Sequence, residues 1–407
     1  MKKFFTAVIC IISMLIFVSC IPENSASQNT VTVTVYENNV KKSDGFLAYM
    51  DGKTGDWKKP EYKNGVYSFD IKSTDKNYSI YAVNSYETFT GTFHTIKIMN
   101  YNISDGNYIL INFENNFSYT SDSTITLNLD NNFINTDTSL FYGSFHEFPD
   151  FSSENNLSHE TCGLHSGTHD FIIVSGPKSG DPEKICIERN KTVLPGAYPE
   201  TLYYSDLKDI DTYTATSLLK DVYVWGELFA GKSTPVFPYF TTPDKNLRLP
   251  DSLKSDDDLY LITLQKYNDI SLSFEIYKTY PESTEIQNTL PSAEWEKPIL
   301  SDNKTFSWKP YDSKIENHNL KKYEIITSDS LNSEWYITVS KNWLGDSSQY
   351  SYTLPDLSLW NSSWNPDLEK NSYTFSAVSG NENNVIKYET PYSGLEISTA
   401  SYNINLH

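Results

Sequence analysis

A period-two alternation of apolar and polar residues constrains the fold of this chain more than any other feature. Val31–Tyr36 reads Val-Thr-Val-Thr-Val-Tyr, which places its valines on one face of an extended strand. Comparable runs, separated by turn residues, recur at Gly65–Ile71, Tyr78–Val83, Tyr108–Phe113 and Leu259–Leu264. The 30 Tyr and 21 Phe suit the pleated, half-buried surfaces of sheets. The pattern of short strands separated by turns predicts an all-β chain of tandem β-sandwich modules with immunoglobulin-like architecture.

The N-terminus has the features of an export signal. Lys2 and Lys3 precede the apolar run Phe4–Val18, which is shorter than the roughly 20 residues that a spanning helix needs. Ser19 and Cys20 end the run, and a polar segment follows them. We therefore expect residues 1–19 to be a signal peptide and the remainder to be exported.

The end of this signal, Phe17-Val18-Ser19-Cys20, resembles the lipoprotein signal of bacteria, in which a cysteine after a small residue is acylated and becomes the new N-terminus. The resemblance implies lipidation at Cys20 and a flexible polar tether over residues 20–30. It also implies a chain that is lipid-anchored to a bacterial membrane, at the cell envelope or surface. Cleavage without lipid and an uncleaved anchor are the alternatives.

The charge balance excludes one class of partner. The chain has 32 Lys and Arg against 52 Asp and Glu, a net charge of −20, and Lys2 and Lys3 leave with the signal. A chain this acidic repels nucleic acid, so we expect no nucleic-acid partner. The sequence contains no phosphate-binding glycine loop, nucleophile elbow or EF-hand loop, and we predict no cofactor and no catalytic residue.

Two stretches resemble known β-sandwich families. Gly65-Val-Tyr-Ser-Phe followed by Tyr78-Ser-Ile-Tyr-Ala-Val resembles the closing strands of transthyretin-like or carboxypeptidase-regulatory-like modules. Thr305–Pro310 followed by Lys322–Ile326 resembles the early strands of a fibronectin type III domain. The resemblances imply structural or binding modules, with packing roles in the fibronectin-like domain for Trp308, Tyr323, Leu357 and Tyr373.

Turn-rich segments and these resemblances suggest a division of the chain. After the signal and tether we predict a transthyretin-like module at 31–130 and a module with a candidate disulfide at 131–195. A β-rich module at 196–290 and a fibronectin type III-like domain at 291–407 follow. Pro281–Pro298 is interpreted as the linker between the last two.

Cysteine and histidine offer two competing sites. With Cys20 lipidated, Cys162 and Cys186 remain as one pair in an oxidising setting, which favours a disulfide. The alternative is a metal site, because zinc accepts His and Cys ligands. Its candidate ligands are His159, Cys162, His165 and His169. Asp256-Asp257-Asp258 is interpreted as a solvated turn, with calcium as the alternative.

Tryptophan supplies the remaining candidate site. Trp343, Trp360 and Trp364 lie in an insertion relative to the fibronectin pattern. They are candidates either to stack on a sugar ring or to cover the edge of the sandwich.

These features predict a membrane-anchored extracytoplasmic lipoprotein with a structural role or a role in binding a glycan or protein ligand. A hydrolase of envelope polymers or glycans, and a carbohydrate-binding surface protein, are the alternatives. An enzyme would need a cleft with convergent polar groups, whereas a binder would need exposed aromatic side chains.

Overall fold

A computed structural model describes much of the chain between Asn29 and Ile404. The described residues are 29–37, 40–41, 46–88, 91–113, 123–129, 136–142, 145–147, 158–160, 167–177, 183–202, 206–214, 222–230, 234–241, 246–249, 253, 255–256, 258–267, 272–280, 290–329, 333–358, 360–361, 364–366, 372–381 and 395–404. The predicted signal peptide and Cys20 lie outside them. Among the described residues, no helix is both long and apolar enough to cross a membrane.

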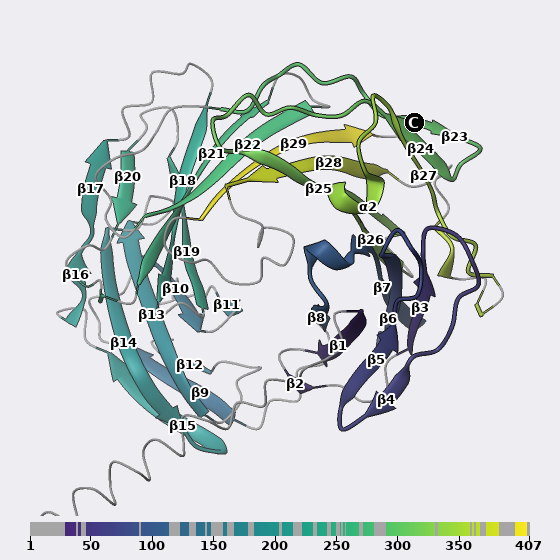
Figure 1. The fold of residues 1–407 in the computed structure, drawn as a ribbon. Helices are drawn as coiled ribbons and strands as arrows, with labels where there is room; N and C mark the ends of the chain where they lie inside the picture. Colours follow the sequence, from purple (N-terminus) through teal and green to yellow (C-terminus); the bar gives the residue numbers. More distant parts are fainter. Residues whose placement is uncertain are drawn as a thin grey trace, which may run out of the picture.

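One eleven-stranded sheet, called here the large sheet, takes strands from both ends of the chain. It forms an arc in Figure 1, from teal strands through yellow and green strands to dark blue ones. Its order is β19-β18-β21-β22-β29-β28-β25-β26-β7-β6-β3. The strands are β3 (Phe46–Asp51), β6 (Asn77–Thr88), β7 (Gly91–Asn102), β18 (Tyr223–Ala230), β19 (Thr234–Thr241), β21 (Leu259–Tyr267), β22 (Leu272–Tyr280), β25 (Asn319–Asp329), β26 (Ser333–Ser340), β28 (Tyr373–Gly380) and β29 (Glu396–Ile404).

Smaller sheets pack on or follow this arc. The N-terminal sheet has the order β2-β1-β5-β4, and β8 pairs with β1 in parallel. Its strands are β1 (Thr30–Glu37), β2 (Val40–Lys41), β4 (Glu61–Lys63), β5 (Val66–Asp70) and β8 (Tyr108–Phe113). A three-stranded sheet contains β23 (Ile299–Ser301), β24 (Thr305–Trp308) and β27 (Tyr350–Thr353).

The middle of the chain forms three more sheets. Their strands are β9 (Ser123–Leu129), β12 (Ser158–Glu160) and β15 (Gly196–Leu202); β10 (Thr136–Tyr142), β11 (Phe145–Glu147), β13 (Gly167–Pro177), β14 (Lys184–Val193) and β16 (Lys208–Asp209); and β17 (Asp211–Thr214) and β20 (Asn246–Leu249). The described helical elements are the turn η1 (Ile103–Asp105) and the short helix α2 (Lys341–Leu344). The all-β prediction is confirmed.

The large sheet has a hydrophobic core on each face, because successive side chains of a strand point in opposite directions. We call the face covered by the three-stranded sheet the outer face, and the face covered by the N-terminal sheet the inner face. In β7, Ile96 and Ile98 join the core of the outer face, whereas Met99 and Tyr101 join that of the inner face. The inner core is completed by the N-terminal sheet, including Val33 and Ile109, which are nearly inaccessible. The first strands of the chain therefore form a sandwich, as the alternating pattern predicts.

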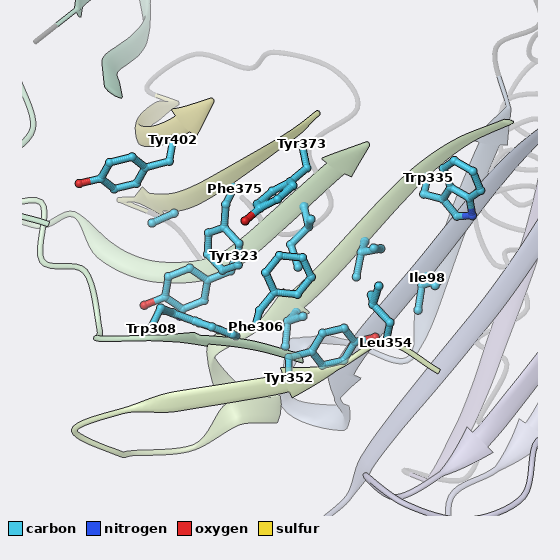
Figure 2. Close-up of a cluster of buried hydrophobic side chains, with 14 of the residues drawn as sticks. Ile98, Phe306, Trp308, Tyr323, Trp335, Tyr352, Leu354, Tyr373, Phe375 and Tyr402 are labelled. Carbon is cyan, nitrogen blue, oxygen red and sulfur yellow. The ribbon is translucent and has the colours of Figure 1, made fainter. Parts of the chain in front are cut away.

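The outer core is closed by the three-stranded sheet. Figure 2 shows Phe306 and Trp308 of this sheet facing Tyr323 and Phe375 of the large sheet. The ring centroids of Trp308 and Tyr323 lie 5.0 Å apart in an edge-to-face arrangement. Trp308, Tyr323, Leu357 and Tyr373 are all buried in this core, so their predicted packing roles are confirmed.

Part of the predicted linker, around Trp295, belongs to the hydrophobic core of the outer face. The Trp295 side chain is buried against Tyr323, Phe375 and Tyr402, and its Nε1 donates to the Lys309 carbonyl oxygen at 3.1 Å. The Tyr402 hydroxyl donates to the Trp295 carbonyl oxygen. Residues 290–298 therefore belong to the outer layer, and their proline content marks irregular backbone rather than a free connection.

Parallel pairing of β7 with β26 joins the two ends of the chain. Seven residue pairs, from Ser333 with His94 to Val339 with Asn100, form the ladder. The buried Asn100 amide spans it, donating to the Thr338 carbonyl oxygen at 2.9 Å and to the Tyr352 hydroxyl at 3.1 Å. The Ser79 hydroxyl donates to its Oδ1 at 2.8 Å. One amide thus connects three segments of the sequence.

A second polar contact lies at the end of this ladder. The carboxylate of Asp105 accepts from the Ser340 hydroxyl and from the Asn342 amide, both at 2.5 Å. Ser340 is also the N-cap of α2, where its Oγ accepts from the Trp343 N–H at 3.0 Å. Asp105 therefore positions the start of α2 against the N-terminal strands.

The sheet pairing crosses the predicted modules. Strands from ranges 31–130, 196–290 and 291–407 are hydrogen-bonded in the large sheet, through β26 with β7 and β22 with β29. The boundaries themselves stay a prediction.

We expect Asn100→Ala to lower the free energy of unfolding by about 1–3 kcal/mol, because it leaves buried polar partners unsatisfied. Urea denaturation followed by tryptophan fluorescence measures the change. Gln349→Ala removes an exposed amide and serves as the control. Equal stability of the two variants would contradict a structural role for the Asn100 bridge.

Candidate functional site

Five aromatic residues from separate segments form what we call the tryptophan cluster: Phe46, Trp57, Tyr81, Trp360 and Trp364. The Phe46 ring centroid lies 5.0 Å from that of Trp360 and 4.9 Å from that of Trp364. Trp360 stacks on Tyr81 at 6.0 Å, and Trp57 meets both rings edge-on. Two of the three tryptophans predicted from sequence are thus brought together on the outer face.

Hydrogen bonds hold the segment that carries Trp360 and Trp364. The Trp335 Nε1 of β26 donates to the Trp364 carbonyl oxygen at 2.8 Å. Asn365 accepts from the Leu357 N–H at 2.9 Å and donates to Asp356 at 3.0 Å. These contacts fix the turn against the sheet, so the two indole rings are preorganised.

Two polar atoms of the cluster are buried. Phe46, Trp57, Trp360 and Trp364 are half-buried, whereas Tyr81 is fully inaccessible. Within the described part of the chain, the Tyr81 hydroxyl and the Trp364 Nε1 have no hydrogen-bond partner. Burial raises the pKa of Tyr81 well above its ordinary value, so the hydroxyl stays neutral. Each unpaired group costs about 1–3 kcal/mol, and both atoms lie beneath the rings, out of reach of a ligand at the surface.

The rim of the cluster is polar. Lys59 Nζ lies 6.0 Å from the Phe46 ring centroid, and the His94 ring lies 6.4 Å from that of Trp364. Burial lowers the pKa of His94, with a smaller opposing effect from Glu87, and its Nδ1 contacts the Ser85 hydroxyl at 2.8 Å. His94 is therefore neutral at pH 7. The arrangement can stack on an apolar ring face and exchange hydrogen bonds at its edge.

The third predicted tryptophan, Trp343, lies elsewhere. It is buried in α2, its ring meets Tyr352 edge-on at 5.9 Å, and Lys53 Nζ lies 5.0 Å over it. Trp343 is buried, and its N–H donates to Ser340, the residue that contacts Asp105. The structure therefore favours packing over ligand stacking at this position.

The predicted metal ligands and the disulfide are only partly within the described residues. His159 and His169 lie in β12 and β13, but Cys162, His165 and the side chains of both histidines lie outside the description. Within the described residues, no group of metal-ligating side chains gathers. The zinc site stays a prediction.

Cys186 carries a free thiol in the structure, so the predicted disulfide with Cys162 is not shown. The thiol is buried, and its Sγ lies 3.7 Å from Glu188 Oε1. Burial, followed by the charge of Glu188, raises the pKa of Cys186 to about 11. The pairing with Cys162 stays a prediction from sequence.

The structure confirms an exposed turn at Asp256 and corrects the solvated-turn interpretation at Asp258. Its carboxylate is buried and accepts two bonds from Arg189, at 3.0 and 2.6 Å. Ser255 donates to the same carboxylate through its N–H and hydroxyl. The fork geometry of arginine satisfies both oxygens, which explains how the charge can be buried. The sequence separates these partners by 69 residues and gives no signal of the pair.

One contact has the residue types of a hydrolase triad. His318 Nδ1 lies 2.9 Å from Ser398 Oγ, and its Nε2 lies 3.0 Å from Glu396 Oε2. Ser398 is fully inaccessible and the His318 side chain is inaccessible too. No substrate can reach this serine in the folded chain, so the contact links the start of β25 to β29 and is not a catalytic site.

Comparisons with known proteins leave the family open. No family model matches the chain, and no curated protein matches it. Among solved structures, a candidate carbohydrate binding protein from Bacteroides uniformis aligns at 7% identity over 70% of this chain and 100% of its own, with a TM-score of 0.15. The chicken CNTN1 FN1–FN3 domains align at 12% identity over 64% of this chain and 86% of their own, with a TM-score of 0.14. TM-scores this low do not establish a shared fold or function.

We expect native protein at pH 8 to leave Cys186 unlabelled by iodoacetamide, because a thiol with a pKa of about 11 is buried and almost wholly protonated. In urea without reductant, Cys186 should become labelled, as peptide mass spectrometry would show. Labelling only after reduction would contradict the free thiol and establish a disulfide.

Proposed function

We propose that this protein is an exported, lipid-anchored binding protein whose ligand is a glycan held at the tryptophan cluster. The observation that carries the proposal is the preorganised set of half-buried rings around Tyr81, with polar side chains at its rim. Sugar rings have an apolar face that stacks on aromatic side chains and hydroxyl groups that pair with polar atoms. The half-buried rings offer the first kind of contact, and Lys59 and His94 offer the second.

The anchor is proposed from the leader. A basic start, a short apolar run and Ser19-Cys20 support acylation of Cys20, and more than one acyl chain gives stable attachment to a membrane. The polar segment after Cys20 would act as the tether. The transthyretin-like region follows this tether directly and would therefore be the membrane-proximal module. Among the described residues, the contact with the residue types of a hydrolase triad contains the buried Ser398 and therefore does not support the hydrolase alternative.

A metabolic fatty-acid label should enter the wild-type protein in a bacterial host and should be lost in Cys20→Ala, because the cysteine is the acylation site. The label is measured by gel fluorescence on membrane fractions. Cys186→Ala is the control and should keep the label. Labelled Cys20→Ala protein would refute the anchor without affecting the glycan proposal.

A glycan array followed by titration should reveal binding by the soluble chain from residue 21. We expect Trp360→Ala to weaken that binding by about tenfold or more, because a stacking surface of this size contributes roughly 1–2 kcal/mol. Because the chain has eight tryptophans, the part of the fluorescence change on binding that is lost in Trp360→Ala reports occupancy of the cluster.

Trp57→Ala is the second variant, since it lies in the turn after β3 and leaves the segment around Trp360 intact. Ile299→Ala removes an apolar side chain that is 66% exposed at a distant position and should bind as the wild type does. No binding by wild type across the array would overturn the proposal.

A further inference from the structure

Between β21 and β26, the inner face of the large sheet carries polar side chains, whereas the outer face carries a hydrophobic core. Directly paired residues of neighbouring strands share a face. The register aligns, from β21 across to β26, a set of residues that we call the polar row: Tyr267, Ser273, Ser401, Ser376, Glu324 and Thr338. The next residues along these strands, such as Phe375 and Tyr402, point into the outer core.

A second row runs beside the first. It contains Asn403, Thr374, Ile326 and Tyr336. The Thr374 hydroxyl donates to Asn403 Oδ1 at 2.8 Å, and the hydroxyls of Ser376 and Ser401 lie 2.8 Å apart. These bonds orient the hydroxyl and amide groups along the sheet, so the surface is a fixed array rather than a set of independent side chains.

Solvent reaches this surface. Tyr267 is 47% exposed and its neighbour Tyr223 is 56% exposed, with ring centroids 6.0 Å apart. Ile326 is 36% exposed, and Glu324, Thr338, Ser401 and Asn403 are half-buried, whereas Ser273 and Ser376 in the middle of the row are buried. The row ends at Met99, where the N-terminal sheet covers the inner face. In Figure 1, β1 and β8 lie on the concave side of the arc, and the row shares their side of the large sheet.

We propose that the polar row is a second glycan site, which binds an extended, neutral polysaccharide lying across the strands. Strands are spaced about 4.8 Å apart, close to the advance of one sugar ring in an extended chain, so the accessible groups of the row, on Glu324, Thr338 and Ser401, can pair with hydroxyls along that chain. Tyr267 brings an exposed aromatic ring to one end, and Tyr336, with Lys97 Nζ 5.5 Å over its ring, lies beside the other. This inference rests on the proposed glycan-binding function.

Charge selects a neutral polymer. Lys322 and Glu324 pair at 2.7 Å on this face and cancel locally, and the chain as a whole carries a net charge of −20. A uronic-acid polymer would be repelled. A protein partner would need an apolar centre to its interface, and serine, threonine and asparagine dominate the two rows instead.

Calorimetry with neutral hexasaccharides of glucose, xylose and mannose, their disaccharides, and a galacturonate hexasaccharide tests the proposal. We expect one neutral hexasaccharide to bind about tenfold or more tightly than its disaccharide, and the galacturonate not to bind. Tyr267→Ala and Asn403→Asp should each weaken the neutral hexasaccharide about three- to tenfold. Asn403→Asp keeps an oxygen that accepts from Thr374 and replaces the amide donor with a charged carboxylate oxygen, which cannot donate to a sugar hydroxyl.

Tyr62→Ala is the matched control, because this tyrosine is 41% exposed on β4, in the N-terminal sheet. Binding that is lost in Trp360→Ala but unchanged in Tyr267→Ala and Asn403→Asp would overturn the polar row and leave the proposed function standing. Wild-type protein that binds none of the neutral sugars would overturn both. Circular dichroism of each variant confirms folding.

Discussion

The parallel pairing of β7 with β26 is the contact on which the rest of the structure depends. It joins β3, β6 and β7, from the first quarter of the chain, to eight strands from the second half, and so makes a single sheet. Asn100 and Asp105 fix its register with bonds to Thr338, Tyr352, Ser340 and Asn342. Because one-residue slippage would turn every side chain to the opposite face, these polar contacts determine which residues enter each core.

The two faces of the large sheet then acquire different chemistry from one set of strands. The outer face is aromatic and is closed by β24 and β27, leaving the tryptophan cluster half-buried where this cover ends. Among the described residues, the inner face is covered by the N-terminal sheet over β3, β6 and β7, and further along the sheet it carries the polar row. Both candidate binding surfaces are therefore margins of hydrophobic cores, where ordered backbone supports partly exposed side chains.

Local sequence patterns predicted many of the individual strands, but few of the contacts between distant segments. The strand at Tyr108–Phe113 is confirmed to the residue, since alternation is a local property. β26 and β29 have no counterpart among the predicted strands, although both alternate and both lie inside the large sheet. Trp360 and Trp364 could be named from sequence, but Phe46, Trp57 and Tyr81 could not, because only the fold brings residues so far apart into contact. The Arg189–Asp258 pair was invisible for the same reason.

The contact between Asn100 and Thr338 spans 238 residues of sequence. Closing so long a loop delays folding, and proteins dominated by such distant pairings belong to the slow end of the range of folding rates. Under the export proposed above this delay is useful, since translocation threads an unfolded polymer through a narrow channel. The N-terminal strands would emerge first and wait, with β7 unpaired along one side, until the C-terminal third arrives to complete them.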